Sequence, residues 1–201
     1  QLGDGLHSDS LSPITPTSGN ILDQDGRFQK VVRTAIRIFR TVITMLLEKH
    51  QIVTVLMAQG NHDMSGSVWL QEMFRALFEN NPRVDIVVSP LPYYAHQHGD
   101  VMLGFHHGHK VNVSQLSGVF THQFRGMLGT TKRTYIHCGH RHQTREMDKS
   151  GMVIEQHETL AARDAYAAHG GWASHRSMQC ITYHDKNLEI GRSTYMVGSV
   201  E

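Results

Sequence analysis

Three short stretches of this sequence carry side chains that can bind a metal ion or move a proton. One is Gly60-Asn61-His62-Asp63, and the others are His106-His107-Gly108-His109 and Gly139-His140-Arg141-His142. Imidazole nitrogens and carboxylate oxygens are common ligands of divalent metals, and histidine also titrates near neutral pH. Each stretch alone can be an ordinary polar turn. The hypothesis of a shared site therefore depends on all three occurring in one chain.

Each polar stretch follows a short apolar run that is typical of a buried strand, at residues 52–57, 101–105 and 134–138. Helical periodicity is found around these runs, over residues 28–50, 68–80 and 113–128. This alternation of helix and strand predicts a parallel α/β sheet. Because such sheets place their chemistry beyond the carboxyl ends of the strands, we expect the three stretches to converge.

The motifs at 60–63 and 139–142 resemble the GNH[DE] and GHxH signatures of the calcineurin-like metallophosphoesterases. The style is closest to the small prokaryotic and phage members and to the nuclease branch. The resemblance covers residues 1 to about 145 by motif and the remainder by architecture only. It implies an α/β fold in which a two-sheet β-sandwich is flanked by helices in four αββα layers, as one domain over residues 1–201.

The resemblance also implies a metal-ligand set. Asp4, which follows Gly3, resembles the aspartate that bridges two metal ions in the family, although Asp9 stands two places later than the family pattern requires. The remaining implied ligands are Asn61, His107, His140 and His142. Two divalent cations are implied, with Mn favoured and Fe, Zn, Ni or Mg also compatible with mixed nitrogen and oxygen ligands.

Other residues take implied roles in catalysis. His62 resembles the family's catalytic histidine, which stabilises or protonates the leaving oxygen, and Asp63 would orient its ring. His109 and Arg141 are expected near the substrate. His106 is the alternative to His107 as ligand, because successive side chains of a strand point to opposite faces and only one of the two fits.

One family signature, Asp-x-His, is absent from the chain and is expected upstream of Gln1. The sequence opens like the end of a strand, so we expect an N-terminal truncation that removes the first strand. The fragment could then be inactive without that segment.

These features together predict a metal-dependent phosphoesterase, with phosphodiester or nuclease-like substrates, in which a metal-bridging hydroxide attacks phosphorus. A phosphomonoesterase or protein phosphatase is an alternative. A non-catalytic metal-binding scaffold or interaction module on the same fold, and a mononuclear metal protein, are others. A partner nucleic acid and a homodimer stay open.

Composition limits these hypotheses. Hydrophobic residues make up 39% and charged residues 18% of 201 residues, as in ordinary globular domains. The net charge of +1 gives no general basic field for nucleic acid. Cys138 and Cys180 form no CxxC pattern, and no apolar run approaches the ~20 residues of a membrane span. We therefore expect a cytoplasmic protein that is not in the membrane.

The other segments allow two interpretations each. The loop 8–26 could be a flap beside the site or an insertion, and residues 93–98 could be a surface hairpin or line a cleft. Hairpins are predicted at 143–158 and 178–195, and a short helix at 160–168. The residues considered for gripping single-stranded nucleic acid are Tyr93, Tyr94, Trp172 and Arg176.

Overall fold

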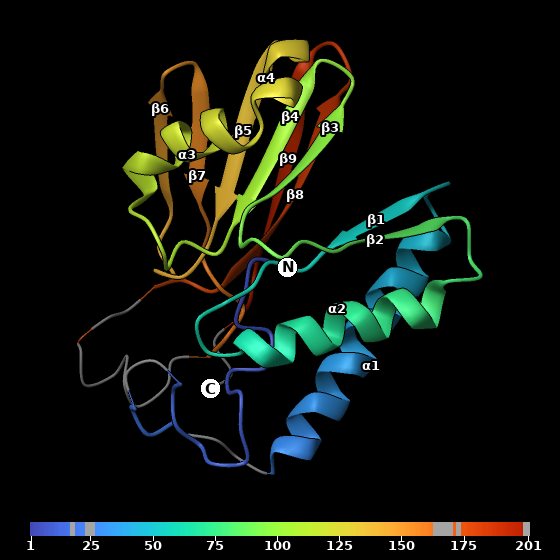
Figure 1. Ribbon diagram of the computed structural model, residues 1–201, viewed down its shortest axis with the longest axis vertical. Helices are drawn as coiled ribbons and strands as arrows, with labels where there is room; N and C mark the ends of the chain where they lie inside the picture. Colours follow the sequence, from blue (N-terminus) through green and yellow to red (C-terminus); the bar gives the residue numbers. More distant parts are fainter. Residues whose placement is uncertain (17–18, 23–26, 163–170, 172–173, 199–201) are drawn as a thin grey trace. The chain divides into compact units, whose positions relative to one another are not determined.

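The computed structural model describes residues 1–201 except 17–18, 23–26, 163–170, 172–173 and 199–201 (Figure 1). It divides into two compact units, residues 1–92 and 93–201. Both units contain helices and strands, so the predicted α/β class is confirmed. The helix predicted at 160–168 falls mostly outside the described residues. Within the described part of the chain, no helix has the length and apolarity needed to cross a bilayer.

The first unit is a strand–helix–strand crossover with one additional helix. Strands β1 (Val53–Leu56) and β2 (Val84–Val87) pair in parallel, and helix α2 (Met64–Phe78) connects them. Helix α1 (Phe28–Leu47) precedes β1 and buries Ala35 and Ile43. The core also contains Leu6, Val53, Met57, Leu70 and Phe74. These elements agree with the periodicity of the sequence.

Helix α2 begins at Met64, four residues before the predicted start at Val68. The predicted start is late because the helix is capped by a distant residue, which the local sequence does not show. The Asp9 carboxylate accepts hydrogen bonds from the N–H groups of Ser65 at 2.8 Å and Gly66 at 2.6 Å. A carboxylate here satisfies free N–H groups and lies favourably in the helix dipole.

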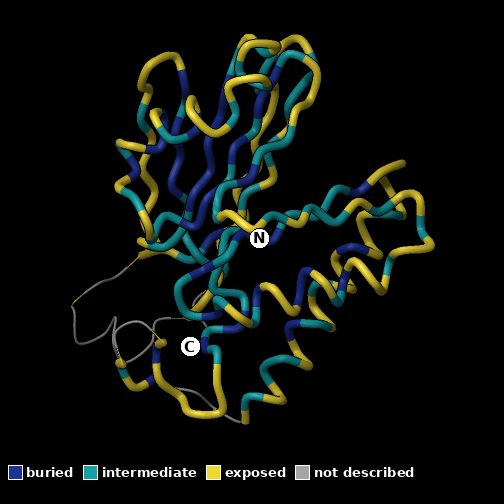
Figure 2. The backbone as a smooth tube through the Cα atoms, in the orientation of Figure 1, coloured by how far each residue is buried: buried dark blue, intermediate teal, exposed yellow. Residues whose placement is uncertain are grey.

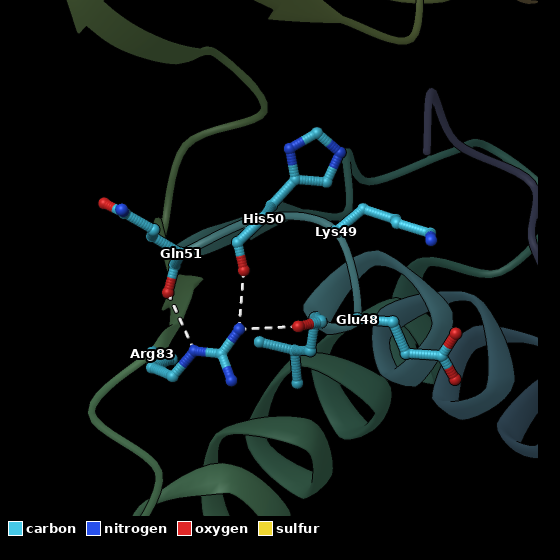
Figure 3. Close-up of a pocket in the computed structure, with 6 residues that line it drawn as sticks. Glu48, Lys49, His50, Gln51 and Arg83 are labelled. Carbon is cyan, nitrogen blue, oxygen red and sulfur yellow. Dashed lines mark hydrogen bonds between the residues drawn. The ribbon is translucent and has the colours of Figure 1, made fainter.

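Arg83 closes the carboxyl end of α1 (Figure 3). Its Nη2 donates to the carbonyl oxygens of Leu47 and His50, at 2.5 and 2.6 Å, and its Nε donates to that of Gln51 at 2.9 Å. These carbonyls follow the last helical turn and have no partner within the helix. Arg83 therefore fixes the turn between α1 and β1.

Replacing Arg83 by alanine is expected to lower the free energy of unfolding by about 1–2 kcal/mol, because charge-assisted bonds to helix-end carbonyls are lost. Arg83→Lys should recover only part of this, since lysine lacks the planar fork. Urea unfolding followed by circular dichroism measures both. Arg37→Ala, on the exposed surface of α1, is the matched control and should change little. Equal losses for Arg83→Ala and Arg37→Ala would contradict the capping role.

The second unit contains a five-stranded mixed sheet in the order β3-β4-β5-β7-β6. Its central strands β4 (Val101–His106), β5 (Arg133–Cys138) and β7 (Met152–Gln156) run parallel. Strands β3 (Tyr94–His98) and β6 (Arg145–Lys149) join antiparallel at the edges. Residues 93–98 are thus in a hairpin, as favoured from the sequence. The central strands carry the most buried backbone of this unit (Figure 2).

Helices cover one face of this sheet. The 3-10 turn η1 (Val113–Gln115), α3 (Leu116–Gln123) and α4 (Arg125–Thr130) follow β4. The single predicted helix 113–128 is wrong in one respect, because Phe124 leaves helical geometry and separates α3 from α4. Phe120 fills the space above Gly104, where an added Cβ would lie 2.5 Å from its ring.

The opposite face of the sheet carries a long hairpin, β8 (Ser177–His184) with β9 (Leu188–Met196). It forms its own two-stranded sheet among the described residues and does not extend the five-stranded one. Tyr183 packs on Tyr135, with ring centroids 4.9 Å apart. The second unit is therefore layered as helices, sheet and hairpin.

Candidate metal centre

In the first unit, the segment around Asp4 is bonded directly to the Gly-Asn-His-Asp turn. Asp4 Oδ1 accepts hydrogen bonds from the backbone N–H groups of Asn61 and His62, each at 2.9 Å. The amino group of Gln1 donates to the carbonyl oxygen of Leu56 at the end of β1, and its carbonyl oxygen accepts from the N–H of Ala58. The sequence placed Asp4 and Asn61 in one site, and the structure brings these two together.

Gly60 makes this approach sterically feasible. A Cβ at this position would lie 2.0 Å from Asp4 Oδ1 and 2.3 Å from the Asp4 nitrogen. Real Cβ atoms do not approach other atoms so closely. The signature glycine is therefore required for the contact between the two segments, whichever ion or substrate is bound.

Gly60→Ala is expected to displace the Asp4 segment and to cost about 1–3 kcal/mol of stability, as overpacking does. Gly118→Ala is the matched control, because an added Cβ meets nothing within 4 Å there and the position lies in α3. It should stabilise by about 0.5–1 kcal/mol. Thermal or urea unfolding of both variants tests this. Unchanged stability in Gly60→Ala would contradict the close approach of Asp4 to Gly60.

His62 and Asp63 have different environments. The Nδ1 atom of His62 lies 3.2 Å from the carbonyl oxygen of His7, so the neutral ring carries its proton on Nδ1. Nε2 then has a lone pair. Asp63 is buried, and it accepts from the Leu6 N–H at 2.9 Å and the Ser67 hydroxyl at 3.0 Å. These bonds anchor α2 to the first residues, while a contact of Asp63 with the His62 ring stays a prediction.

In the second unit, the ends of β4 and β5 bring three imidazoles together. His106 and Cys138 are register partners in these parallel strands, so the residues that follow them leave the sheet side by side. The His107 and His140 rings have centroids 5.0 Å apart, and the His109 ring lies 5.3 Å from His107. The predicted convergence of the second and third stretches is confirmed by this geometry.

His106 points elsewhere. Its ring stacks on Tyr93 at 4.8 Å, and its Nδ1 accepts the Gly108 N–H at 2.8 Å. Burial, followed by the charges of His109 and His107, lowers the pKa of His106 to about 3, so the ring is neutral. Tyr94 is also buried. Neither tyrosine considered for stacking on nucleic-acid bases is therefore placed for it.

Backbone strain is found at several predicted site residues. Asp4, His140 and His142 have φ values of 54°, 71° and 53°, and His7 has 64°. Left-handed backbone costs about 1–2 kcal/mol for a residue with a Cβ. Such conformations gather at functional sites, where the surrounding structure holds them in place. His142 and Arg141 lie in the exposed loop after β5.

A second set of metal-ligating side chains lies on the other face of the sheet, and sequence reasoning missed it. His137, Glu155 and His157 offer ligand atoms that all lie within 4.8 Å of one another. His137 Nδ1 is 2.9 Å from His157 Nε2, and the Tyr183 hydroxyl is 2.9 Å from His137 Nε2. Arg192 binds both oxygens of Glu155, through Nη1 to Oε1 and through Nη2 to Oε2 at 2.8 Å.

This arrangement fits a hydrogen-bonded network that joins the hairpin to the sheet. Glu155 is buried and neutralised by Arg192, which also pairs with Glu189 at 2.9 Å. Every residue of β5 from Thr134 to Cys138 is buried, so no alternation marks His137 as an inner polar position. The partners on β8 and β9 are too distant in sequence to be inferred from any pattern.

Stability is expected to fall as the pH drops below about 6.5. Burial, then the charge of His157 and Arg192, lowers the pKa of His137 to about 3, and burial lowers that of His157. The unfolded chain therefore binds protons first, and each histidine contributes up to about 1.4 kcal/mol per pH unit. Urea unfolding at pH 7.5 and 5.0 measures this. His157→Gln should make the free energy of unfolding depend less on pH, and His122→Gln, at an exposed position, should leave that dependence unchanged. An equal dependence on pH in wild type and both variants would contradict the prediction.

The fold and the site define a class of protein. It is a mixed α/β protein with one group of candidate metal ligands at its strand ends and another on a face of its sheet. No protein-family profile matches the chain, and no curated protein matches it. Among solved structures it is similar to wild-type Vps29 complexed with Zn²⁺ from Entamoeba histolytica, with 15% identity and a TM-score of 0.45. The match covers 80% of this chain and 84% of that one. A likeness of this extent assigns neither family nor function.

Proposed function

We propose that the protein is a metal-dependent phosphoesterase that hydrolyses phosphodiesters. The observation that carries the proposal is the group of imidazoles formed by His107, His109 and His140 beyond two neighbouring parallel strands. Imidazoles that approach one another in this way suit a transition-metal ion. The left-handed backbone of His140 supports the same conclusion.

We assign the ligands according to the calcineurin-like metallophosphoesterases that the motifs resemble. Asp4 and Asn61 of the first unit, with His107, His140 and His142 of the second, would hold two divalent ions. His107 is preferred to His106, because the His106 ring is engaged by Tyr93 and the Gly108 N–H. The backbone N–H groups of Asn61 and His62 donate to Asp4 Oδ1 and so hold this carboxylate at the Gly-Asn-His-Asp turn.

When bound, the ions would polarise a phosphoryl oxygen and supply a hydroxide for in-line attack. The protein's own residues do the remainder. In its imidazolium form His62 would give the Nε2 proton to the leaving oxygen, while the His7 carbonyl holds the ring through Nδ1–H. His109 and Arg141 would bind the phosphoryl oxygens of the substrate.

Hydrolysis of bis(p-nitrophenyl) phosphate by chelated and then reconstituted protein tests the proposal. We expect turnover with Mn²⁺ and none with chelator, and two ions per chain by mass spectrometry. His107→Ala should lower metal content and turnover, whereas His122→Ala, at an exposed position in α3, should change neither. p-Nitrophenyl phosphate should be the poorer substrate.

The outcomes separate the alternatives. Bound metal without turnover would favour a metal-binding scaffold, and one ion per chain would favour a mononuclear protein. Preference for the monoester would favour a phosphomonoesterase. Absence of both metal and turnover would overturn the proposal. We also propose a cytoplasmic location, supported by two cysteines, Cys138 and Cys180, that form no disulfide.

A further inference from the structure

A pocket of about 500 Å³ opens in the second unit beside the proposed centre. It is formed by the loop after β4 and the loop after β5, so it lies beyond the carboxyl ends of two neighbouring parallel strands. His109 and His140 form part of its wall. Pockets of roughly 300–1,000 Å³ accommodate ligands larger than a single phosphate, such as a nucleotide.

The charged side chains that line this pocket are all positive. Lys110, Arg141 and Arg145 line it, and none of its described lining residues carries a carboxylate. Within the described ranges these three cations form no ion pair, whereas Arg192 and Lys132 do. Arginine and lysine in such a setting bind phosphate.

The pocket is also shaped before any ligand arrives. Buried Gln156 donates from Nε2 to the Gln143 carbonyl at 2.8 Å and so holds the loop after β5. Asn112 accepts from the N–H and hydroxyl of Ser114 at 3.1 Å and so holds the loop after β4. Lys110 and Arg145 are exposed on these two ordered segments. Less ordering is then needed when an anion binds.

We infer that this pocket binds the phosphate next to the scissile linkage of an oligonucleotide strand, with Lys110 and Arg145 as the specificity-determining cations. The inference rests on the proposed function, since His109 and His140 would hold the reacting phosphate at the pocket wall. Of the tyrosines considered for base stacking, Tyr94 is buried and Tyr93 stacks on His106, so recognition relies on phosphate charge. Binding should therefore be independent of sequence and dependent on salt.

Fluorescence anisotropy with a labelled 12-residue oligothymidylate, in chelator so that no cleavage occurs, tests the inference. The double variant Lys110→Gln/Arg145→Gln should weaken binding roughly tenfold at low salt, and should lower the salt slope by about 1.4, or about 0.7 for each lost contact. Lys186→Gln/Arg125→Gln removes the same charge from exposed positions that do not line the pocket, and should change neither.

Hydrolysis distinguishes this inference from the proposed function. The double variant should hydrolyse bis(p-nitrophenyl) phosphate, which has no second phosphate, with unchanged kcat/KM. Unchanged oligonucleotide affinity in the double variant would overturn the inference, as would displacement of the strand by an equal nucleotide concentration of thymidine 5′-monophosphate. If oligonucleotide binding depends on both cations but wild type hydrolyses nothing, the proposed function fails and the pocket stands.

Discussion

His62→Ala is expected to lower phosphodiester hydrolysis by about 10²–10⁴-fold while leaving metal content unchanged. The structure gives His62 a half-exposed ring that is anchored through Nδ1, and its backbone N–H bonds to Asp4. In its imidazolium form such a ring can donate a proton from Nε2 without being a ligand. Steady-state kinetics and metal analysis on the same samples measure the two quantities separately.

The leaving group identifies the role of His62. A nitrophenolate leaves readily without a proton, whereas a nucleoside alkoxide does not, so the loss in His62→Ala should be larger for an oligonucleotide than for bis(p-nitrophenyl) phosphate. His122→Ala serves as the control for an exposed imidazole. Equal losses on both substrates would contradict proton donation, and loss of metal would show that His62 is needed for ligand binding instead.

The parts of the site that could be predicted from sequence are those set by strand ends. An apolar run followed by Gly or His fixes where a strand stops, and parallel neighbours stop at the same edge. This reasoning placed His107 beside His140, and their rings lie 5.0 Å apart. The same reasoning gave α1, β1 and both C-terminal hairpins, because each has its own periodicity or turn.

The remainder depends on contacts between residues that are distant in the chain. Asp9 caps α2 across 56 residues, and Arg83 caps α1 across 36. Neither leaves a local pattern, since one charged residue in a loop resembles any other. The break at Phe124 was missed for a related reason. The apolar spacing continues through it, and only the backbone angles show that α3 ends.

The second large effect is expected at Arg192. Arg192→Met should lower the free energy of unfolding by about 3–5 kcal/mol, because it leaves the Glu155 carboxylate buried without its counterion. The Glu155 side chain is only 3% exposed, and Arg192 binds both of its oxygens. Methionine retains the apolar stem, so the change is mainly one of charge. Urea unfolding at pH 7.5 gives the magnitude.

Two further variants identify the cause. Glu155→Gln/Arg192→Met should recover much of the loss, since no unpaired charge is then buried. Arg75→Met removes an exposed pair with Glu72 and should cost at most about 1 kcal/mol. A double variant as unstable as Arg192→Met would show that packing, and not charge, joins the hairpin to the sheet.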